Sequence, residues 1–575
     1  MNQHNLAYLK DVILKAVHAV GFEVNPEDLH LEKTKTLEHG HFASNVAMFI
    51  AKKYGQSPRE AAQKIMEAIK DPIIKKAEIA GPGFINVFVE QKFYTDECRS
   101  LCKNLDIYIQ ESLGFKPGEK TLLIDTSHPN VAKPMGVHHL LSTIIGSALA
   151  QLYRKIGYNV INDNYIGDWG TQFGKLIYAI HTWGDLAKIE KDPIPELLTL
   201  YVRFHEESEK DPTLDDHGRA EFKKLEEGDS ESRKLWRYIV EISLSEFQKL
   251  YKRLGVTFDV INGESFYENK MESILNEGRK AGIIVDGEKE AWIIKPEDPN
   301  DPPTVVRKSD GATLYMTRDL ARIKYWEETW HPDLMVNVVD VAQSLYFRQL
   351  FSATDKLNLT KAHNVHVNFG RMSFKDGKMS TRKGNILKLE EVLDEAEERA
   401  LKLAREKAIE LSEEEQKELA RIMGIGAVKY NILSQNRVNN ITFDWDLMLS
   451  FEGNSVPYLM YTATRAQSIL KKAGVDEKEV ESYSLQLDDD HEKMVITDLM
   501  MYTDALHRAG EEFKPNHIAN YLYALAQDYN ALYNALSILQ AEDNAKKTRL
   551  LLTLAVIRVV KHGLTILGID VPEKM

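Results

Sequence analysis

The clearest pattern of hydrophobic and polar positions lies between Thr121 and Ile161. A short apolar run at 121–124 has the length of a buried strand, and a polar loop follows it. The next apolar residues recur at helical spacing as far as Leu152, and a second strand-like run occupies 158–161. This order predicts a strand–helix–strand unit with parallel strands and a right-handed crossover. Ligands of such sheets bind at the carboxyl ends of the strands, where helix N-termini attract phosphate.

The hydrophobic pattern of the whole chain predicts three domains. Residues 1–108 carry short helical and strand-like runs, which predict a small α+β domain. Residues 109–390 hold the parallel-strand unit and a charge-rich insertion at about 185–300, in which 206–231 predicts a solvated helix face. Residues 391–575 keep a 3.6-residue apolar period and predict an all-α helical bundle. We therefore expect an α/β fold with an α+β domain before it and a bundle after it.

Composition narrows the class of protein. The 575 residues are 43% hydrophobic, which supports sizeable cores, but no apolar run approaches the ~18 residues that cross a membrane. The N-terminus lacks a signal-segment pattern, and the two cysteines, Cys98 and Cys102, exclude a disulfide framework. We therefore expect a cytoplasmic protein. The net charge of −14 argues mildly against nonspecific nucleic-acid binding, so an RNA partner needs local basic patches.

The loop after the first strand holds the best candidates for chemistry. Its side chains include donors suited to a polyanion, namely Ser127, Asn130, Lys133, His138 and His139. A second candidate is the stretch 164–174, where three glycines are costly to order unless the backbone must approach something closely.

Five stretches together resemble the class I aminoacyl-tRNA synthetases, in the form seen in arginyl-tRNA synthetases. They are PNVAK at 129–133, STIIG at 142–146, NYIGDWGTQFG at 164–174, KSDGATLYMTRD at 308–319 and KMSTRKGN at 378–385. The resemblance implies a Rossmann-like parallel-sheet core, with a connective insertion at about 185–300.

The chain departs from the family pattern at four positions of this region, two of them in one motif. The family's His-x-Gly-His tetrad reads Gly136-Val137-His138-His139 here, so that the first His and the Gly are exchanged. Thr381 replaces the second Lys of Lys-Met-Ser-Lys-Ser, a change common in arginyl enzymes, where the Lys at position 133 is thought to take over. Tyr346 stands where the family usually has His.

Motifs near both ends resemble the family's tRNA-contacting domains. GHFASN at 40–45 and GPGFIN at 81–86 match the N-terminal domain that touches the tRNA elbow, although the family usually has Asp at His41. The stretches 453–461 and 567–575 match the anticodon-binding domain. The expected tRNA-binding residues are Asn45, Asn86, Tyr458, Tyr461 and Met575. The two tyrosines can stack on splayed bases, or they can be core aromatics.

The resemblance implies an arginine–tRNA ligase that works in two steps. The carboxylate of L-arginine attacks the α-phosphate of ATP, and the terminal ribose of tRNA(Arg) then attacks the arginyl-adenylate. Such chemistry depends on alignment and on charge neutralisation. We therefore expect ATP with Mg²⁺ and no structural metal. The resemblance further implies activation that requires bound tRNA, and we expect a monomer. His128, His138 and His139 suggest zinc only weakly, because no fourth ligand has suitable spacing.

The resemblance also assigns roles residue by residue. A planar guanidinium needs a carboxylate fork and an aromatic wall, which Asp319 and Tyr315 can supply from one helix face. The full arginine set is Asp125, Ser127, Asn130, Tyr315, Asp319 and Gln343. The expected ATP set is Lys133, Gly136, His138, His139, Met372 and Lys378. The expected catalytic set is Lys133, His139, Lys378, Ser380 and Lys383.

The altered tetrad leaves more than one interpretation open. His138 can replace the lost donor through a shifted loop, or adenylation is weak and the chain is a noncatalytic tRNA-binding protein. A third possibility is a nucleotide-binding α/β enzyme that acts on another small substrate and uses the bundle for protein contacts. The Tyr315–Asp319 and Tyr458–Tyr461 pairs argue against the third possibility.

Overall fold

The computed structural model describes residues 6–34, 37–298, 301–375 and 388–575. Contacts group the chain into two compact units. Unit 1 contains Met1–Pro117, Lys155–Gly157 and Leu449–Met575, and unit 2 contains Gly118–Arg154 and Tyr158–Met448.

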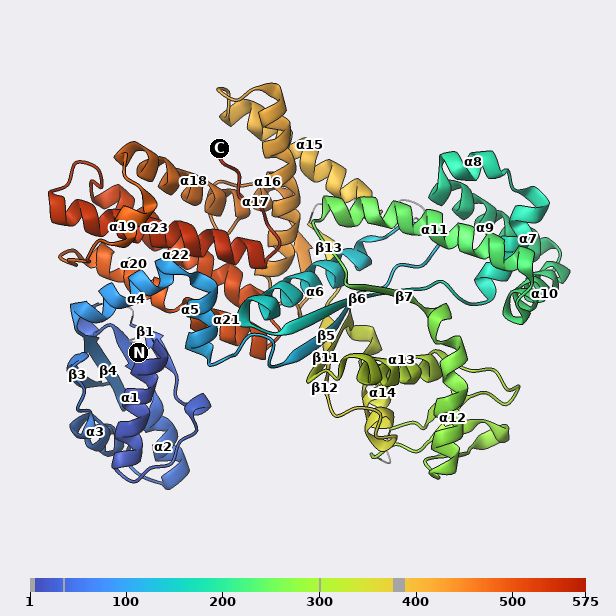
Figure 1. Ribbon diagram of the computed structural model, residues 1–575, viewed down its shortest axis with the longest axis horizontal. Coiled ribbons are helices and arrows are strands. Elements are labelled where there is room, and N and C mark those ends of the chain that lie inside the picture. The colour runs from blue at the N-terminus through green and yellow to red at the C-terminus, as the bar shows by residue number, and fades with distance from the viewer. Residues whose placement is uncertain (1–5, 35–36, 299–300, 376–387) are drawn as a thin grey trace. The chain divides into compact units, whose positions relative to one another are not determined.

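A five-stranded parallel sheet forms the centre of unit 2 (Figure 1). Its order is β12-β11-β5-β6-β7, with β5 in the middle. The strands are β5 (Thr121–Ser127), β6 (Asn159–Ile166), β7 (Val260–Gly263), β11 (Leu334–Asp340) and β12 (His363–Phe369). The helix α6 (Val137–Ile156) joins β5 to β6 and buries the predicted stripe, including Leu140, Ile144 and Ala148. The predicted strand–helix–strand unit is therefore confirmed.

The helices α13 (Tyr315–Trp330) and α14 (Ser344–Lys356) pack with strands of this sheet in one hydrophobic core. That core contains Leu123 of β5, Met335 of β11, Trp326 of α13 and Leu350 of α14, all completely buried. The helix α12 (Met271–Lys280) and a small antiparallel sheet join the same core. The small sheet has the order β10-β9-β8, with β8 at Ile284–Asp286, β9 at Trp292–Ile294 and β10 at Thr304–Arg307.

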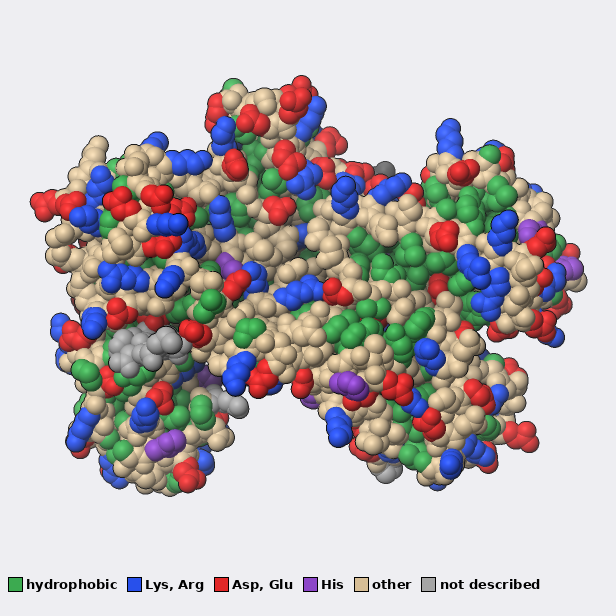
Figure 2. Space-filling view, in the orientation of Figure 1, with side chains coloured by type: hydrophobic (Ala, Val, Ile, Leu, Met, Phe, Trp, Pro, Cys, Tyr) green, Lys and Arg blue, Asp and Glu red, His purple; other side chains and the backbone are tan. Residues whose placement is uncertain are grey.

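The range 185–300 is not uniform. Most of it is helical, but β7 within it is the edge strand of the parallel sheet. The helix α7 (Thr171–Trp183) precedes this range. Within it lie the helices α8 (Leu186–Lys191), α9 (Pro193–Lys210), α10 (Thr213–Glu227) and α11 (Ser230–Arg253), and the 3₁₀-helix η3 (Glu264–Lys270) follows β7. The helices α7 to α11 share a separate core around Phe173, Phe204 and Ile239. Acidic and basic side chains lie together at the edge of these helices in Figure 2, as expected for a solvated face.

The last part of unit 2 contains two long helices, α15 (Leu389–Lys407) and α16 (Glu413–Ser434), which pack together. Two short strands pair in parallel: β13 (Met372–Phe374) precedes these helices in the chain, and β14 (Ile441–Phe443) follows them. The helix α17 (Trp445–Met448) ends the unit. A capping box begins α16, in which Ser412 and Glu415 satisfy each other's backbone N–H groups.

The N-terminal part of unit 1 is an antiparallel sheet with helices. The sheet order is β1-β2-β4-β3, from β1 (Leu31–Lys33), β2 (Phe42–Ser44), β3 (Ile74–Ala80) and β4 (Phe84–Val89). The helices are α1 (Leu6–Ala19), α2 (Val46–Tyr54), α3 (Pro58–Ala68), α4 (Gln91–Lys103) and α5 (Leu105–Leu113). The predicted α+β character is confirmed.

The C-terminal part of unit 1 is helical throughout, as the 3.6-residue period predicts. Its helices are α18 (Val456–Ala473), α19 (Glu477–Glu481), α20 (Asp490–Met500), α21 (Tyr502–Glu511), α22 (Asn516–Ala535) and α23 (Asp543–Ile566). Lys33 of β1 reaches this bundle, where its Nζ lies 2.5 Å from Asp498 and 2.6 Å from Asp528. Among the described helices, none combines the length and the apolar character needed to cross a membrane.

Candidate active site

The loop between β5 and α6 is fixed to the end of β6. The N–H of Gly167 donates to the carbonyl of Pro129 at 3.0 Å, and the N–H of Val131 donates to the carbonyl of Gly167 at 3.1 Å. A side chain on Gly167 would come within 2.6 Å of Oδ1 of Asn130, so glycine permits this close approach. Asn130 is exposed at the carboxyl edge of the sheet, where the sequence predicts a ligand.

Ser127 is completely buried, in contrast to Asn130. Its Oγ accepts a hydrogen bond from Thr143 at 2.9 Å and lies 2.9 Å from the hydroxyl of Tyr251. Asn164 donates to the same tyrosine at 3.2 Å. Ser127 therefore ties β5 to α6 and α11. Sequence reasoning missed Tyr251, because no local pattern connects it to a loop so far away in the chain.

The altered tetrad sits at the start of α6. Nδ1 of His139 accepts the backbone N–H of Gly136 at 3.0 Å. Burial, with smaller effects from His138 and His128, lowers the pKa of His139 to about 3. His138 is exposed, its ring centre lies 3.9 Å from that of His139, and burial of its inner part lowers its pKa. Both imidazoles are therefore neutral near pH 7.

The remaining candidates for ATP lie on other segments. Nζ of Lys133 lies 4.8 Å from the centre of the Tyr201 ring of α9, in a cation–π contact. Met372 begins β13 and is half-buried. Lys378, Ser380 and Lys383 lie outside the described residues.

A buried group of charges lies beneath α13, at the carboxyl ends of the central strands. Asp125 is completely buried, and its Oδ2 accepts a hydrogen bond from Arg322 at 2.8 Å. Arg322 also contacts Asn337 of β11 at 3.3 Å and Asp319 at 3.6 Å, and its guanidinium lies 4.0 Å from the ring centre of Tyr165. Burial opposes the charge of Asp125, but Arg322 and His128 outweigh it and lower the pKa of this carboxyl.

Asp163 is a third carboxyl in this group. It is completely buried on β6, and neither oxygen has a hydrogen-bond partner among the residues that the structure describes. Burial and the neighbouring charge of Asp125 raise the pKa of Asp163 well above its ordinary value, which favours the neutral form of this carboxyl. Sequence reasoning missed both Asp163 and Arg322, because each lies outside the motifs and has the appearance of an ordinary charged residue in its local sequence.

The predicted arginine-binding pair, Tyr315 and Asp319, lies on one helix as expected. Tyr315 begins α13 with 61% of its surface exposed, whereas Asp319 one turn later is 9% exposed. The hydroxyl of Tyr346 on α14 donates to Oδ2 of Asp319. Gln343 ends the 3₁₀-helix η5 (Val341–Gln343) and is exposed.

A cavity of about 470 Å³ opens beside Tyr315. Arg318 crosses it to Glu264 at 3.1 Å and Glu268 at 2.6 Å, and burial raises the pKa of Glu264 to about 7. Asp168 belongs to the glycine-rich stretch. Its carboxylate accepts hydrogen bonds from the backbone N–H and the hydroxyl of Ser265 in η3. Among the glycines of this stretch, Gly174 makes a close approach to the backbone of α10, where an added side chain would come within 2.1 Å of the carbonyl of Gly218.

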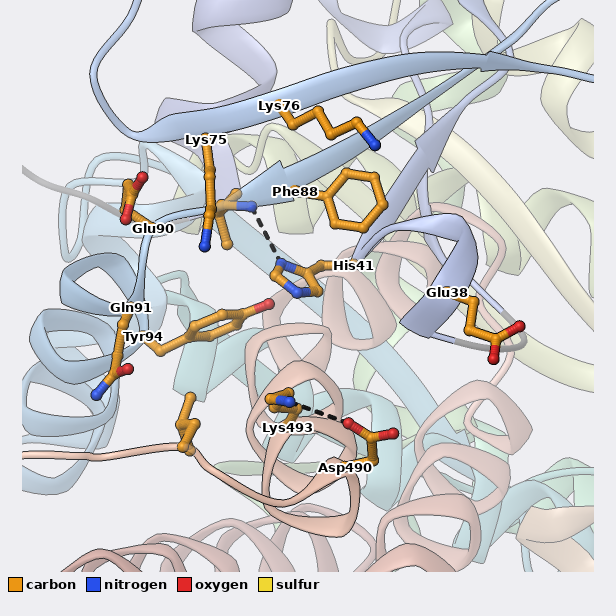
Figure 3. Close-up of a pocket in the computed structure, with 12 residues that line it drawn as sticks. Glu38, His41, Lys75, Lys76, Phe88, Glu90, Gln91, Tyr94, Asp490 and Lys493 are labelled. Atoms are coloured by element: carbon orange, nitrogen blue, oxygen red, sulfur yellow. Dashed lines mark hydrogen bonds and ion pairs between the residues drawn. The ribbon is translucent and has the colours of Figure 1, made fainter.

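In unit 1, His41 lines a cavity of about 580 Å³ (Figure 3). Its Nδ1 accepts the N–H of Val89 at 3.0 Å, and burial lowers its pKa to about 4. Figure 3 places Tyr94 beside His41 and shows Lys493 paired with Asp490 below them. Of the predicted tRNA-binding residues, Asn86 is buried on β4, the strand that pairs with β2, and Asn45 is half-buried before α2.

The predicted tyrosines of the bundle differ in exposure. Tyr461 is 40% exposed, and the guanidinium of Arg465 lies 4.5 Å from its ring centre and 4.7 Å from that of Tyr533. Tyr458 is half-buried, with its ring centre 5.6 Å from that of Tyr523. Met575 is half-buried at the last position. The ring of Tyr461 is thus more accessible to solvent than the ring of Tyr458.

No group of three or more His, Cys, Asp or Glu side chains among the described residues has the arrangement of a metal site. His128, His138 and His139 form no such group within that part of the chain.

Three family models match the chain. The catalytic domain of tRNA synthetases class I (R) matches residues 106–445, the DALR anticodon binding domain matches 459–575, and the arginyl tRNA synthetase N terminal domain matches 7–89. The first match covers more than half of the chain.

Several similar proteins are arginine–tRNA ligases or arginyl-tRNA synthetases. An arginine–tRNA ligase of Fusobacterium nucleatum is 42% identical over 542 residues, which are 93% of each chain, and one of an Exiguobacterium species is 41% identical over 95% of each. The solved arginyl-tRNA synthetase of Plasmodium falciparum has a TM-score of 0.84 at 25% identity and covers 99% of this chain and 98% of its own. That of Thermus thermophilus, at 23% identity and a TM-score of 0.81 over 99% of each chain, shares the fold.

Proposed function

The chain belongs to the arginyl-tRNA synthetase family of class I aminoacyl-tRNA synthetases, and from this membership we propose that it joins L-arginine to the 3′-terminal adenosine of tRNA(Arg) with ATP as the activating substrate. The observation that carries the proposal is the 42% identity to an arginine–tRNA ligase over 93% of both chains. In the first step, an arginine carboxylate oxygen bonds to the α-phosphorus of ATP and pyrophosphate leaves. In the second, a ribose hydroxyl bonds to the carbonyl carbon and AMP leaves.

Arginine binding is assigned to the carboxyl edge of the parallel sheet. The proposed residues are Asp125, Ser127, Asn130, Tyr315, Asp319 and Gln343. Asn130, Tyr315 and Gln343 are exposed there, so they are the members with most surface to offer a ligand. Asp125 and Ser127 are completely buried, and their contacts hold the loop and α13 in place. Asp319 lies between these groups and supplies a carboxylate to the guanidinium.

ATP binding is assigned to Lys133, Gly136, His138, His139, Met372 and Lys378. Neutral His139 at the start of α6 can hold a phosphate oxygen together with the helix N-terminus. Lys133, His139, Lys378, Ser380 and Lys383 are proposed to neutralise the charge of the departing pyrophosphate. Mg²⁺ carried with ATP would neutralise part of the same charge.

The other domains are assigned to tRNA. Residues 1–108 are proposed to contact the elbow through Asn45 and Asn86, and residues 391–575 to read the anticodon through Tyr458, Tyr461 and Met575. The catalytic domain is then 109–390. We further propose that the protein works as a monomer in the cytoplasm and that bound tRNA is required for activation of arginine.

The test is arginine-dependent exchange of pyrophosphate into ATP, with and without tRNA(Arg). Exchange that appears only with tRNA supports an active ligase of this family and shows that Gly136 and His138 are tolerated. A protein that binds tRNA without any exchange would instead be the noncatalytic alternative. As a matched variant, Gly136→His with His138→Gly restores the family tetrad and should not lower activity.

A further inference from the structure

Asp125 and His128 form a carboxylate–imidazole pair in the loop after β5. Nε2 of His128 lies 2.8 Å from Oδ1 of Asp125, while Arg322 holds the other oxygen. This distance is within hydrogen-bond range, although the ring N–H is not well aligned with Oδ1. Catalytic hydrogen bonds are commonly this loose without substrate and tighten in the complex.

The two side chains of the pair differ in their exposure to solvent. Asp125 is completely buried, and so is the Nε2 atom of His128, yet the His128 side chain as a whole keeps 26% of its surface exposed. The exposed part therefore lies on the side of the ring away from Asp125. Nδ1 on that side makes no hydrogen bond to any residue in the described ranges. A histidine that gives Nε2–H to a carboxylate offers the lone pair of Nδ1 as a proton acceptor.

Asp125 is suited to fix this arrangement. Although burial alone would raise the pKa of Asp125, the charge of the neighbouring Arg322 guanidinium lowers it and favours the ionised carboxylate. Arg322 holds it from the opposite side, and strand β5 fixes its backbone. A fixed carboxylate that selects the tautomer of a histidine is the arrangement by which a general base is oriented in other enzymes.

The two neighbouring histidines cannot do the same. Nδ1 of His139 is already occupied by the N–H of Gly136, and its ring is almost completely buried. His138 is exposed but lies against the His139 ring, and Asp340 acts on it through its charge without a hydrogen bond or ion pair between these two described residues. His128 is thus the histidine of this loop that combines a carboxylate partner with an exposed nitrogen.

We propose that His128 is the general base of the transfer step, and that Asp125 is its positioning residue. Nδ1 of His128 takes the proton of the attacking ribose hydroxyl. The ribose oxygen forms a bond to the carbonyl carbon of the arginyl-adenylate, and the bond from this carbon to the phosphate oxygen breaks. AMP leaves with the electron pair, and the proton on His128 passes to solvent. This inference rests on the proposed function.

The experiment separates the two steps. The variant His128→Gln keeps an N–H donor for Asp125 but has no base, and His363→Gln, on β12, is the matched control. Both are assayed by pyrophosphate exchange in the presence of tRNA(Arg), and by single-turnover transfer from preformed arginyl-adenylate. For His128→Gln we expect transfer to fall about 10²–10⁴-fold while exchange stays within about threefold. The acid limb of the transfer rate against pH should also disappear.

A second variant tests Asp125. Asp125→Asn should slow transfer, and the double variant with His128→Gln should be no slower than His128→Gln alone, because the two residues act as one unit. Thermal unfolding of each variant separates this effect from loss of fold. Unchanged transfer in a folded His128→Gln protein, or an equal loss in both steps, would overturn the inference alone. Absence of exchange in the wild-type protein would overturn the proposed function and the inference with it.

Discussion

The guanidinium of Arg322 lies 2.8 Å from the carboxylate of Asp125, and neither side chain exposes more than 3% of its surface. Asp319 is the second carboxylate near this guanidinium, at 3.6 Å. Asp163 is a third carboxyl group nearby, so three carboxyl groups share the one guanidinium of Arg322 in this buried group. This excess of carboxyl groups over cations at the floor of the proposed arginine site is suited to a further cation, such as the guanidinium of a substrate.

Arg322→Met should destabilise unit 2 and weaken arginine binding. Removing one partner of a buried ion pair typically costs about 3–5 kcal/mol, since the other charge is left uncompensated. The control is Arg253→Met, whose guanidinium is 28% exposed and pairs with Asp394 and Glu397. Exposed pairs are worth about 0–1 kcal/mol, so this variant should change little. Urea unfolding compares the two free energies of unfolding.

Arg322→Lys separates stability from binding at the same position. Lysine keeps the charge but cannot contact Asp125 and Asn337 with a planar fork. We expect a smaller loss of stability than in Arg322→Met and a clear rise in KM for arginine, with KM for ATP unchanged. An equal rise in both constants would mean that Arg322 supports the whole fold and not the arginine site.

Tyr346→Phe should lower kcat/KM for arginine. The tyrosine hydroxyl donates to Asp319, and hydrogen bonds to charged groups are worth about 1.5–3 kcal/mol. Without this bond, Asp319 loses its fixed orientation toward a guanidinium. Tyr483→Phe is the control, because it removes a hydroxyl that donates to Glu479 at an exposed site of unit 1. If both variants aminoacylate equally well, Tyr346 does not orient Asp319 for the substrate.

His41 predicts a pH dependence of stability in unit 1. Its pKa in the folded protein is about 4, below the ordinary value of 6.5, because burial disfavours the charged ring. Between these values the unfolded chain binds more protons than the folded protein. The contribution of His41 to the free energy of unfolding is therefore fully present above about pH 6.5 and is lost as the pH falls toward 4. His41→Asn keeps an acceptor for the N–H of Val89 but does not titrate.

The measurement is the melting temperature at several pH values between about 7 and 4. The wild-type protein should lose more stability across this window than His41→Asn does. His507→Asn, on α21, serves as the control and should follow the wild type. Parallel curves for wild type and His41→Asn would show that His41 takes up its proton without a cost to the fold.

Tyr461→Ala should weaken tRNA binding without unfolding the bundle. The ring is 40% exposed and flanked by Arg465, and stacking of one base on an aromatic side chain is worth about 1–3 kcal/mol. Tyr461→Phe keeps the ring and should bind nearly as well as wild type. The dissociation constant for tRNA(Arg), measured at one fixed salt concentration, decides between stacking and a core role. A drop in melting temperature with unchanged affinity would favour the core role.

Local patterns predicted much of the fold. The strands β5 and β6 and the helix α6 follow from runs of four to twenty residues, and Tyr315 and Asp319 share a helix because their spacing is local. The strand β7 was not distinguished from the insertion around it, since three half-buried or exposed residues and one buried glycine carry too weak a period.

The contacts of the candidate site were harder to predict than its members. Arg322 is one turn after Asp319, and in the sequence it reads as one more surface charge of α13. Its burial depends on β5, β6 and β11 meeting beneath the helix, which no local pattern encodes. The same reason applies to Tyr251, whose hydroxyl reaches Ser127 only when α11 has packed against the loop.

The composition of unit 1 determines when one of its helices can become buried during synthesis on the ribosome. The helix α4 buries Phe93, Cys98 and Leu101, and it packs against α20 and α23. The ribosome synthesises the whole of unit 2 after α4 and before α20 and α23. At about 5–20 residues per second, the apolar face of α4 waits on the order of tens of seconds for its covering helices. The emerging chain must therefore keep an uncovered hydrophobic surface from aggregating until its final helix has been made.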